Sequence, residues 1–295
     1  MITINYYEKV KELPQIFTQL ACKDLLFVHY RCPLDQRIAG KWSQHNYIMY
    51  ILSGKKAYHT PDRSWLLTGG TAVFVKKGAV IIEKFFDEPL CIMTFFVPDS
   101  YLNLFMRQHH SIAKTNFSKE VDNYQVIPLE VTEMMRAYFD SMVPYFNAEK
   151  KPSEDLLELK FRELLLNILT NPANSDLNYY LQALQLPKAD QLQQVMEANC
   201  LFNLSLQDYA KLCNRSLSSF KRDFLSVYKI NPGKWLLSKR LDYSHHLLLT
   251  SDKTINDISF ESGFENTTHF SRAFKKRFGQ PPSQLRQEEI TSQVS

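Results

Sequence analysis

Glycine is scarce in this sequence, with only eight glycines among 295 residues. Loops that cradle phosphate groups depend on closely spaced glycines, whose backbone can approach the ligand. Neither Gly-x-Gly-x-x-Gly nor Gly-x-x-x-x-Gly-Lys occurs, and the Gly-x-Ser-x-Gly motif of serine hydrolases is also missing. We therefore expect no nucleotide cofactor and no enzymatic activity of these classes.

Cysteines are few, and long apolar runs are missing. The five cysteines are widely spaced and form no Cys-x-x-Cys pair, which argues against a disulfide framework or a zinc site. No segment approaches the ~18 apolar residues of a membrane helix. The N-terminus lacks the basic flank and apolar stretch of a secretory signal. These absences favour a cytoplasmic protein without a membrane partner.

Positive charge is concentrated near the C-terminus. The whole chain carries a formal net charge of +4. The segment from Leu204 to Arg286 holds 14 basic and seven acidic residues, so its net charge is +7 and that of the remainder is −3. A basic segment beside a slightly acidic remainder suggests a polyanionic partner for that segment alone.

The first ~115 residues are rich in short β-branched and aromatic runs, which are typical of strands. These runs lie at 25–30, 47–52, 71–75, 79–82 and 91–97. Turn-forming residues such as those at 60–62 and 68–70 separate them. This spacing predicts a small antiparallel barrel or a jelly roll.

Two helical patterns follow, over 129–146 and 154–170, the second with Ser153 as its N-cap. The second helix is apolar on more than one face, so it must be covered on two sides. A partner helix would bury one stripe, which predicts a homodimer; alternatively, a single chain covers both faces. The stripe expected at the dimer interface has i, i+4, i+7, i+11 spacing and consists of Leu157, Phe161, Leu164 and Ile168.

The C-terminal part contains one structural pattern twice. In each copy a capping residue opens a short helix, a tight turn follows, and a second capped helix completes the copy. The first copy begins at Ser205 and continues as a helix over 217–228. The second begins at Thr254, turns at Gly263 and continues as a helix over 267–278. Each copy matches a DNA-reading helix-turn-helix.

A helix predicted over 232–249 joins the two copies. At a rise of 1.5 Å per residue it spans about 27 Å. A strut of that length can place two recognition helices near the ~34 Å repeat of successive major-groove faces. The pattern therefore predicts double-stranded DNA as the partner of this part of the chain.

The second copy resembles the signature of the AraC/XylS family of transcription regulators. Residues 255–286 read INDISFESGFENTTHFSRAFKKRFGQPPSQLR. Within that family, the layout of the N-terminal part is most similar to ExsA-like activators. The resemblance implies an activator that contacts RNA polymerase.

The resemblance also implies an α+β fold with two domains. A cupin-like β-barrel with following helices is expected over 1–172, as a sensor and dimerisation domain. A linker is expected over 173–188, and an all-α DNA-binding domain with two helix-turn-helix units over 189–290.

The resemblance assigns base-reading positions on the outward face of each recognition helix. They are Ser218, Ser219, Lys221 and Arg222 in the first unit, and Thr267, Thr268, Ser271 and Arg272 in the second. Arginine can bind guanine through two hydrogen bonds, whereas serine and threonine offer hydroxyl contacts. The N-caps Ser216 and Asn266 are expected to hold phosphates. Ser218 and Ser219 are small where bulkier residues are common in the family.

Two interpretations of the N-terminal domain remain open. An open barrel interior would bind a small-molecule effector, whereas a filled interior would indicate a protein effector. The candidate ligand-binding residues are Trp42, His45, Tyr47, Tyr58, His59 and Trp65. The alternative function is a cupin-type small-molecule-binding protein or metal enzyme with a helical appendage. Because no His-x-His motif is present, we expect no metal ion and no cofactor.

Overall fold

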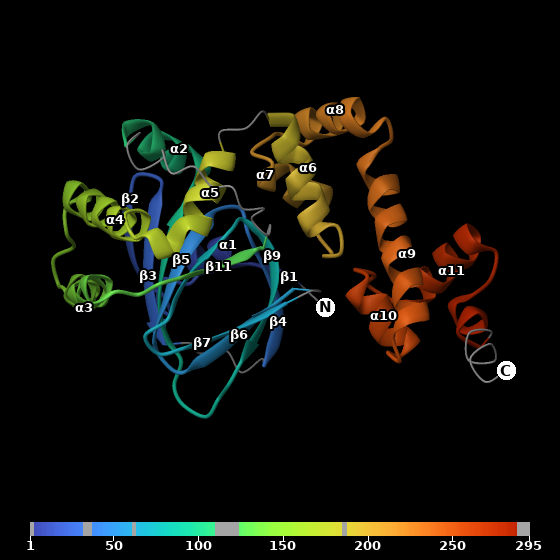
Figure 1. Cartoon of the computed structure of the whole chain (residues 1–295), viewed down its shortest axis with the longest axis horizontal. Helices are drawn as coiled ribbons and strands as arrows, with labels where there is room; N and C mark the ends of the chain where they lie inside the picture. The colour runs from blue at the N-terminus through green and yellow to red at the C-terminus, as the bar shows by residue number, and fades with distance from the viewer. Residues whose placement is uncertain (1–2, 32–36, 61–62, 110–123, 185–187, 288–295) are drawn as a thin grey trace. The chain divides into compact units, whose positions relative to one another are not determined.

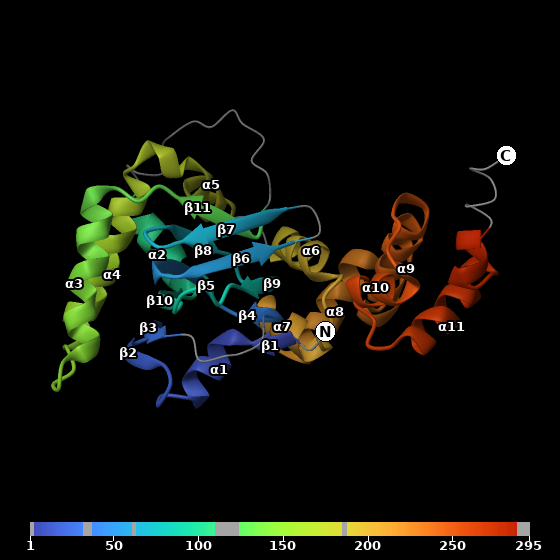
Figure 2. The same cartoon turned by 90° about the horizontal axis from the view of Figure 1, so that it is seen from below.

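The computed structural model of the chain describes residues 3–31, 37–60, 63–109, 124–184 and 188–287 (Figures 1 and 2). The chain divides into two compact units, residues 4–187 and residues 188–295 together with residues 1–3. Both sheets lie in the N-terminal part and the C-terminal part is helical, which confirms the predicted α+β class. None of the described helices is long and apolar enough to cross a membrane.

The strands form two sheets rather than one closed barrel, which fits the jelly roll among the two alternatives that we predicted. One sheet has the order β1 (Thr3–Asn5), β4 (Ile38–Ser43), β9 (Gly78–Lys84), β6 (Lys55–His59) and β7 (Ser64–Thr68). The other has the order β11 (Val126–Leu129), β8 (Ala72–Val75), β5 (Asn46–Ser53), β10 (Cys91–Val97), β3 (Leu25–Arg31) and β2 (Thr18–Cys22). Antiparallel pairing holds in both, for example between β5 and β10 and between β6 and β9.

The six-stranded sheet is buried on both faces, because successive side chains of a strand point to opposite sides. Val28, Met49 and Phe96 belong to the core shared with the five-stranded sheet. Phe27 and Phe95 belong to a second core, shared with helices. Two sheets that bury each other's apolar faces satisfy the strand pattern without closing into one barrel.

Among the described residues, five helices and a short 3-10 helix accompany the sheets. They are α1 (Tyr6–Glu12), α2 (Asp99–Gln108), α3 (Glu133–Asn147), α4 (Glu154–Leu169), η2 (Pro172–Asn174) and α5 (Ser175–Ala183). The Ser153 side chain accepts a hydrogen bond from the backbone N–H of Leu156 and caps α4 as predicted. In Figure 2, α3 and α4 run side by side at the end of the unit that carries β2 and β3.

The predicted dimer stripe on α4 is buried inside its own domain. Leu157, Phe161, Leu164 and Ile168 are all at most 2% exposed and belong to the core beneath the six-stranded sheet. The ring of Phe161 stacks on that of Phe27, with centroids 5.7 Å apart. The prediction of a dimer interface through this stripe is therefore wrong, because β2 and β3 already cover the face on which a partner helix would pack.

The predicted linker over 173–188 is also wrong for most of its length. Pro172 opens η2 instead of ending structure, and α5 follows, with Leu177 and Leu181 buried in the sheet–helix core. Residues 185–187 of that prediction lie outside the described residues. The first unit therefore extends through α5.

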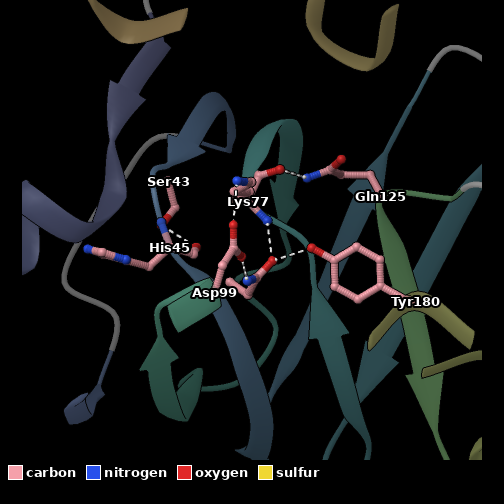
Figure 3. Close-up of polar contacts among 7 residues, drawn as sticks. Ser43, His45, Lys77, Asp99, Gln125 and Tyr180 are labelled. Carbon is pink, nitrogen blue, oxygen red and sulfur yellow. Dashed lines mark hydrogen bonds and ion pairs between the residues drawn. The ribbon is translucent and has the colours of Figure 1, made fainter. Parts of the chain in front are cut away.

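Buried polar contacts fix α5 to the sheet (Figure 3). Asn46 is 0% exposed, and its side-chain oxygen accepts bonds from the Tyr180 hydroxyl (2.8 Å) and the Lys77 backbone N–H (2.9 Å). Its amide donates to Asp99, which forms an ion pair with Lys77. Burial raises the pKa of Tyr180, so the hydroxyl stays a hydrogen-bond donor. These bonds hold the last helix of the first unit against the start of β5.

The second unit consists of helices with boundaries close to those predicted. They are α6 (Lys188–Asn199), α7 (Leu206–Leu212), α8 (Leu217–Tyr228), α9 (Pro232–Thr250), α10 (Ile255–Glu261) and α11 (Thr267–Phe278). Ser205 and Asp208 form a reciprocal capping box at the start of α7, which satisfies two N–H groups that the helix cannot pair itself.

Candidate nucleic-acid interface

The first helix-turn-helix consists of α7, a turn and α8. The turn passes through Asn214, whose φ of 53° is tolerated by asparagine better than by most residues. Ser216 then caps α8 by accepting a bond from the Ser219 backbone N–H. Phe220 and Phe224 are both 0% exposed and hold α8 against the rest of the unit. The opposite face of α8 is therefore presented to solvent.

The second helix-turn-helix is built the same way from α10 and α11. Gly263 forms the turn with a φ of 80°, and Asn266 caps α11 by accepting a 2.8 Å bond from the His269 backbone N–H. Phe270 and Phe274 are 0% exposed and lie in one core with residues of α9. The repeated pattern in the sequence thus corresponds to two folded units of the same type.

On α8, the predicted positions Ser218, Lys221 and Arg222 are exposed and Ser219 is partly exposed. The Arg222 guanidinium donates to the Ser219 hydroxyl (3.1 Å) and lies 3.3 Å from Asp223. Its side chain is still 76% exposed, so these surface contacts are weak and can yield to a DNA ligand.

On α11, Thr268 and Arg272 are exposed, while Thr267 and Ser271 are partly exposed. The Thr267 hydroxyl donates to the Asn256 side chain at 2.8 Å, which ties the start of α11 to α10. Four exposed residues on the same helix were not among our predicted contacts: His269, Lys275, Lys276 and Arg277. The lysines follow Thr268 and Arg272 at helical spacing, a signal that was readable from the sequence.

Both predicted phosphate-binding caps, Ser216 and Asn266, are exposed at the N-termini of their helices. There the helix dipole and N–H groups favour an anion. Arg277 differs from its neighbours, because its guanidinium bonds to Asp242 (2.5 Å) and Ser238 (2.9 Å) on α9. The candidate interface therefore consists of the two outer helix faces and their caps.

Three of the six candidate ligand residues of the N-terminal domain share the core between the sheets, so the six do not form one site. Tyr47 and Tyr58 meet in the core between the sheets, where their hydroxyls are 3.3 Å apart, and Trp65 lies in the same core. His59 contacts Ser64 and Glu83, and His45 packs on Tyr7. Trp42 pairs with Ala79 in register, so it faces away from the core that Val80 and Ile82 enter.

The core between the sheets also contains a lysine that the sequence did not single out. Lys56 is 2% exposed, and its Nζ donates to the Tyr58 hydroxyl at 3.2 Å and lies 4.6 Å from the centre of the Tyr58 ring. A lysine in a strand resembles a solvent-facing residue, so no pattern in the sequence reveals its burial. Among the described residues, no group of three or more His, Cys, Asp or Glu side chains is arranged to hold a metal ion.

Two family models match the chain. The ExsA N-terminal regulatory domain matches residues 46–180, and a helix-turn-helix domain matches residues 209–288. The first match covers much of the sheet unit and the second covers α8 to α11. Together they agree with the division of the chain into a regulatory and a DNA-binding part.

Similar proteins include one transcriptional activator, one transcriptional regulator and one protein of known structure. The virulence regulon transcriptional activator VirF of Yersinia enterocolitica is 25% identical over 82% of this chain and 89% of its own length. The HTH-type transcriptional regulator ExsA of Pseudomonas aeruginosa is 25% identical over 91% of this chain and 94% of its own. The structure of ToxT from Vibrio cholerae aligns with a TM-score of 0.41 at 16% identity, over 90% of this chain and 98% of that one, and at that score it supports no conclusion.

Proposed function

We infer that this chain, which belongs to the AraC family of transcription regulators, binds two successive major grooves of double-stranded DNA with α8 and α11. The chain is a DNA-binding regulator with a regulatory N-terminal domain. The observation that carries the inference is the paired arrangement of the recognition helices. Each buries two phenylalanines and leaves a polar or basic face in solvent.

The spacing of the two helices supports simultaneous binding. The connecting helix α9 has 19 residues, which correspond to about 28 Å at 1.5 Å per residue. Successive major-groove faces are ~34 Å apart. We propose that Arg222 and Arg272 bind bases or phosphates, that the serines and threonines beside them contact bases, and that Ser216 and Asn266 hold phosphates.

Genome-wide mapping of bound DNA, followed by binding assays on the recovered sites, tests this proposal. We expect a site with two conserved segments about one helical turn apart, because each recognition helix reads one segment. Affinity for this site should fall steeply as the salt concentration rises. Equal affinity for the recovered site and a scrambled duplex would contradict sequence-specific binding.

We further propose that a protein effector, rather than a small molecule, acts on the N-terminal domain. The proposal is supported by the position of Trp42 and His59, which face away from the core between the sheets, and by the bond between the Tyr47 and Tyr58 hydroxyls within it. A reporter gene controlled by the recovered site, in cells that express the full chain, tests it. The Tyr47→Phe and Tyr58→Phe variants should keep the response to the inducing condition. If a small-molecule effector bound these hydroxyls, the variants would lose that response.

The names of the relatives support activation as the sign of regulation. We propose that the chain works in the cytoplasm and contacts RNA polymerase when it is bound upstream of a promoter. In vitro transcription with purified polymerase tests whether the protein activates transcription and whether contact with the polymerase is sufficient for activation. A decrease in transcript on addition of the protein would contradict activation.

A further inference from the structure

The helix α9 belongs to both helix-turn-helix units. Near its start, the ring of Trp235 packs on Phe224 and Tyr228 of α8, with centroids 5.8 and 5.0 Å apart. Near its end, Leu241 and Leu248 lie in the core of the second unit. Arg240 lies between these two apolar segments of the helix. A contact that holds α9 in place at Arg240 therefore also sets the position of one helix-turn-helix unit relative to the other.

The guanidinium of Arg240 bonds to the loop that precedes the first unit. Its Nε donates to the carbonyl oxygen of Cys200 at 2.8 Å, and its Nη2 donates to that of Phe202 at 2.7 Å. A planar, permanently charged group that donates two bonds fixes orientation better than a single neutral bond does. The loop between α6 and α7 is therefore fastened to the middle of α9.

The turn of the second unit rests on the same loop. A Cβ placed on Gly263 would lie 2.5 Å from the carbonyl oxygen of Leu201 and 3.0 Å from the Nε of Arg240. The turn thus approaches so closely that only glycine fits, and its φ of 80° favours glycine as well. Beside it, the Asn203 amide donates to Glu265 at 2.9 Å. The loop between α6 and α7, the helix α9 and the turn at Gly263 therefore all meet at Arg240.

We infer that Arg240, seated against Gly263, sets the separation and mutual rotation of the two recognition helices, so that the protein reads its two DNA segments as one rigid pair. This inference rests on the proposed binding of DNA by both α8 and α11. Arg240 acts as a positioning residue, because two of its donors bond to the carbonyl oxygens of the loop.

A rigid pair and a flexible pair respond differently to DNA spacing. In a rigid pair, binding of one helix presents the other to its segment at high effective concentration, but only at one spacing. An insertion of two base pairs turns the second segment by roughly 70° and moves it out of reach. A flexible pair loses affinity at the natural spacing and tolerates the insertion.

The test uses the full chain and labelled duplexes that carry the recovered site, with two base pairs inserted or none. The measured quantity is the spacing ratio, the Kd on the inserted duplex divided by the Kd on the natural one. For the unaltered protein we expect a ratio of roughly ten or more. For Arg240→Met we expect the Kd on the natural duplex to rise roughly tenfold and the ratio to fall below about three.

Two further variants support the interpretation. Gly263→Ala keeps Arg240 but forces the turn away from the loop, so it should lower the spacing ratio as well. Lys239→Met removes one positive charge from the neighbouring position, where the amine pairs with Glu197, and should leave the ratio unchanged. Circular dichroism melting verifies that each variant is folded. If Arg240→Met does not fold, Gly263→Ala alone decides.

The inference would be overturned if Arg240→Met and Gly263→Ala bound more weakly but kept the spacing ratio of the unaltered protein. Arg240 would then contribute to stability or to charge, and not to the relative placement of the two recognition helices. Unchanged binding at both spacings would overturn it too. If the unaltered protein does not distinguish the recovered site from a scrambled duplex, the proposed function itself fails, and this result is seen before any variant is compared.

Discussion

The ring of Phe27 on β3 stacks on that of Phe161 on α4 at a centroid distance of 5.7 Å. The two residues are 134 positions apart in the sequence. This contact covers the α4 face that the helical pattern alone would assign to a second chain. The stripe on α4 is thus a core element of the regulatory domain, and its substitution tests folding rather than association.

We predict that Phe161→Ala lowers the free energy of unfolding of the regulatory domain by about 3–5 kcal/mol, because it leaves a cavity beneath the sheet. Thermal melting of the full chain measures the change. Leu159→Ala on the same helix is the control, since Leu159 is 62% exposed and its substitution should stay within about 0.5 kcal/mol. A Phe161→Ala protein that melts like the parent would contradict the assignment of this face to the core.

In the second helix-turn-helix unit, Phe274→Ala should cost about 3–5 kcal/mol for the same reason. Phe274 is 0% exposed and packs on Phe270 and Phe278, at centroid distances of 5.6 and 4.5 Å. Phe260→Ala provides the comparison, because Phe260 on α10 is 39% exposed. Denaturant unfolding, followed by the far-UV circular dichroism of the helices, measures the free energy of unfolding of both variants. Equal losses of stability would show that the inner face of α11 is misassigned.

Arg272→Ala should weaken specific DNA binding by about 1–3 kcal/mol if Arg272 reads a base. If it holds a phosphate instead, the loss should be similar on all sequences and the salt dependence of binding should become shallower. Fluorescence anisotropy on the recovered and scrambled duplexes separates the two roles. The control is Arg37→Ala, which removes an exposed arginine paired with Glu83 in the regulatory domain. Unchanged affinity on both duplexes would remove Arg272 from the interface.

Lys76 predicts a pH dependence of stability. Burial lowers the pKa of its amine from 10.5 to about 8, although Asp176 opposes the shift. Below about pH 8 the folded chain must bury the charged amine. Between about pH 8 and 10.5 only the unfolded chain keeps this proton, so the contribution of Lys76 to stability rises with pH across that window.

Lys76→Met should therefore stabilise the fold at pH 7 by about 1–3 kcal/mol. The free energy of the pKa shift sets the upper bound of this gain. Loss of the contact between the amine and the Tyr180 ring, 4.8 Å away, reduces it. The difference between variant and parent should shrink as the pH rises from 8 to 10.5. Thermal melts at several pH values measure it, with Lys55→Met at an exposed position as control. A difference that does not depend on pH would contradict the shift.

The sequence alone was sufficient wherever structure depends on neighbours along the chain. Ser205 and Asp208 cap a helix within four residues, and Asn266 and Gly263 fix the start and the turn of the second unit within one turn of helix. Periodic phenylalanines then select the buried face of each recognition helix. The double helix-turn-helix and its outward residues could therefore be predicted closely.

Only the tertiary structure decided the features that depend on distant partners. Tyr180 bonds to Asn46 across 134 residues and places α5 in the domain instead of in a linker. The strand pattern is the same whether strands close into a barrel or form two sheets, because it specifies which face is apolar and not which sheet covers it. Arg240 shows no pattern at all, since its role depends on backbone carbonyls about 40 residues away that only the fold brings within hydrogen-bonding distance.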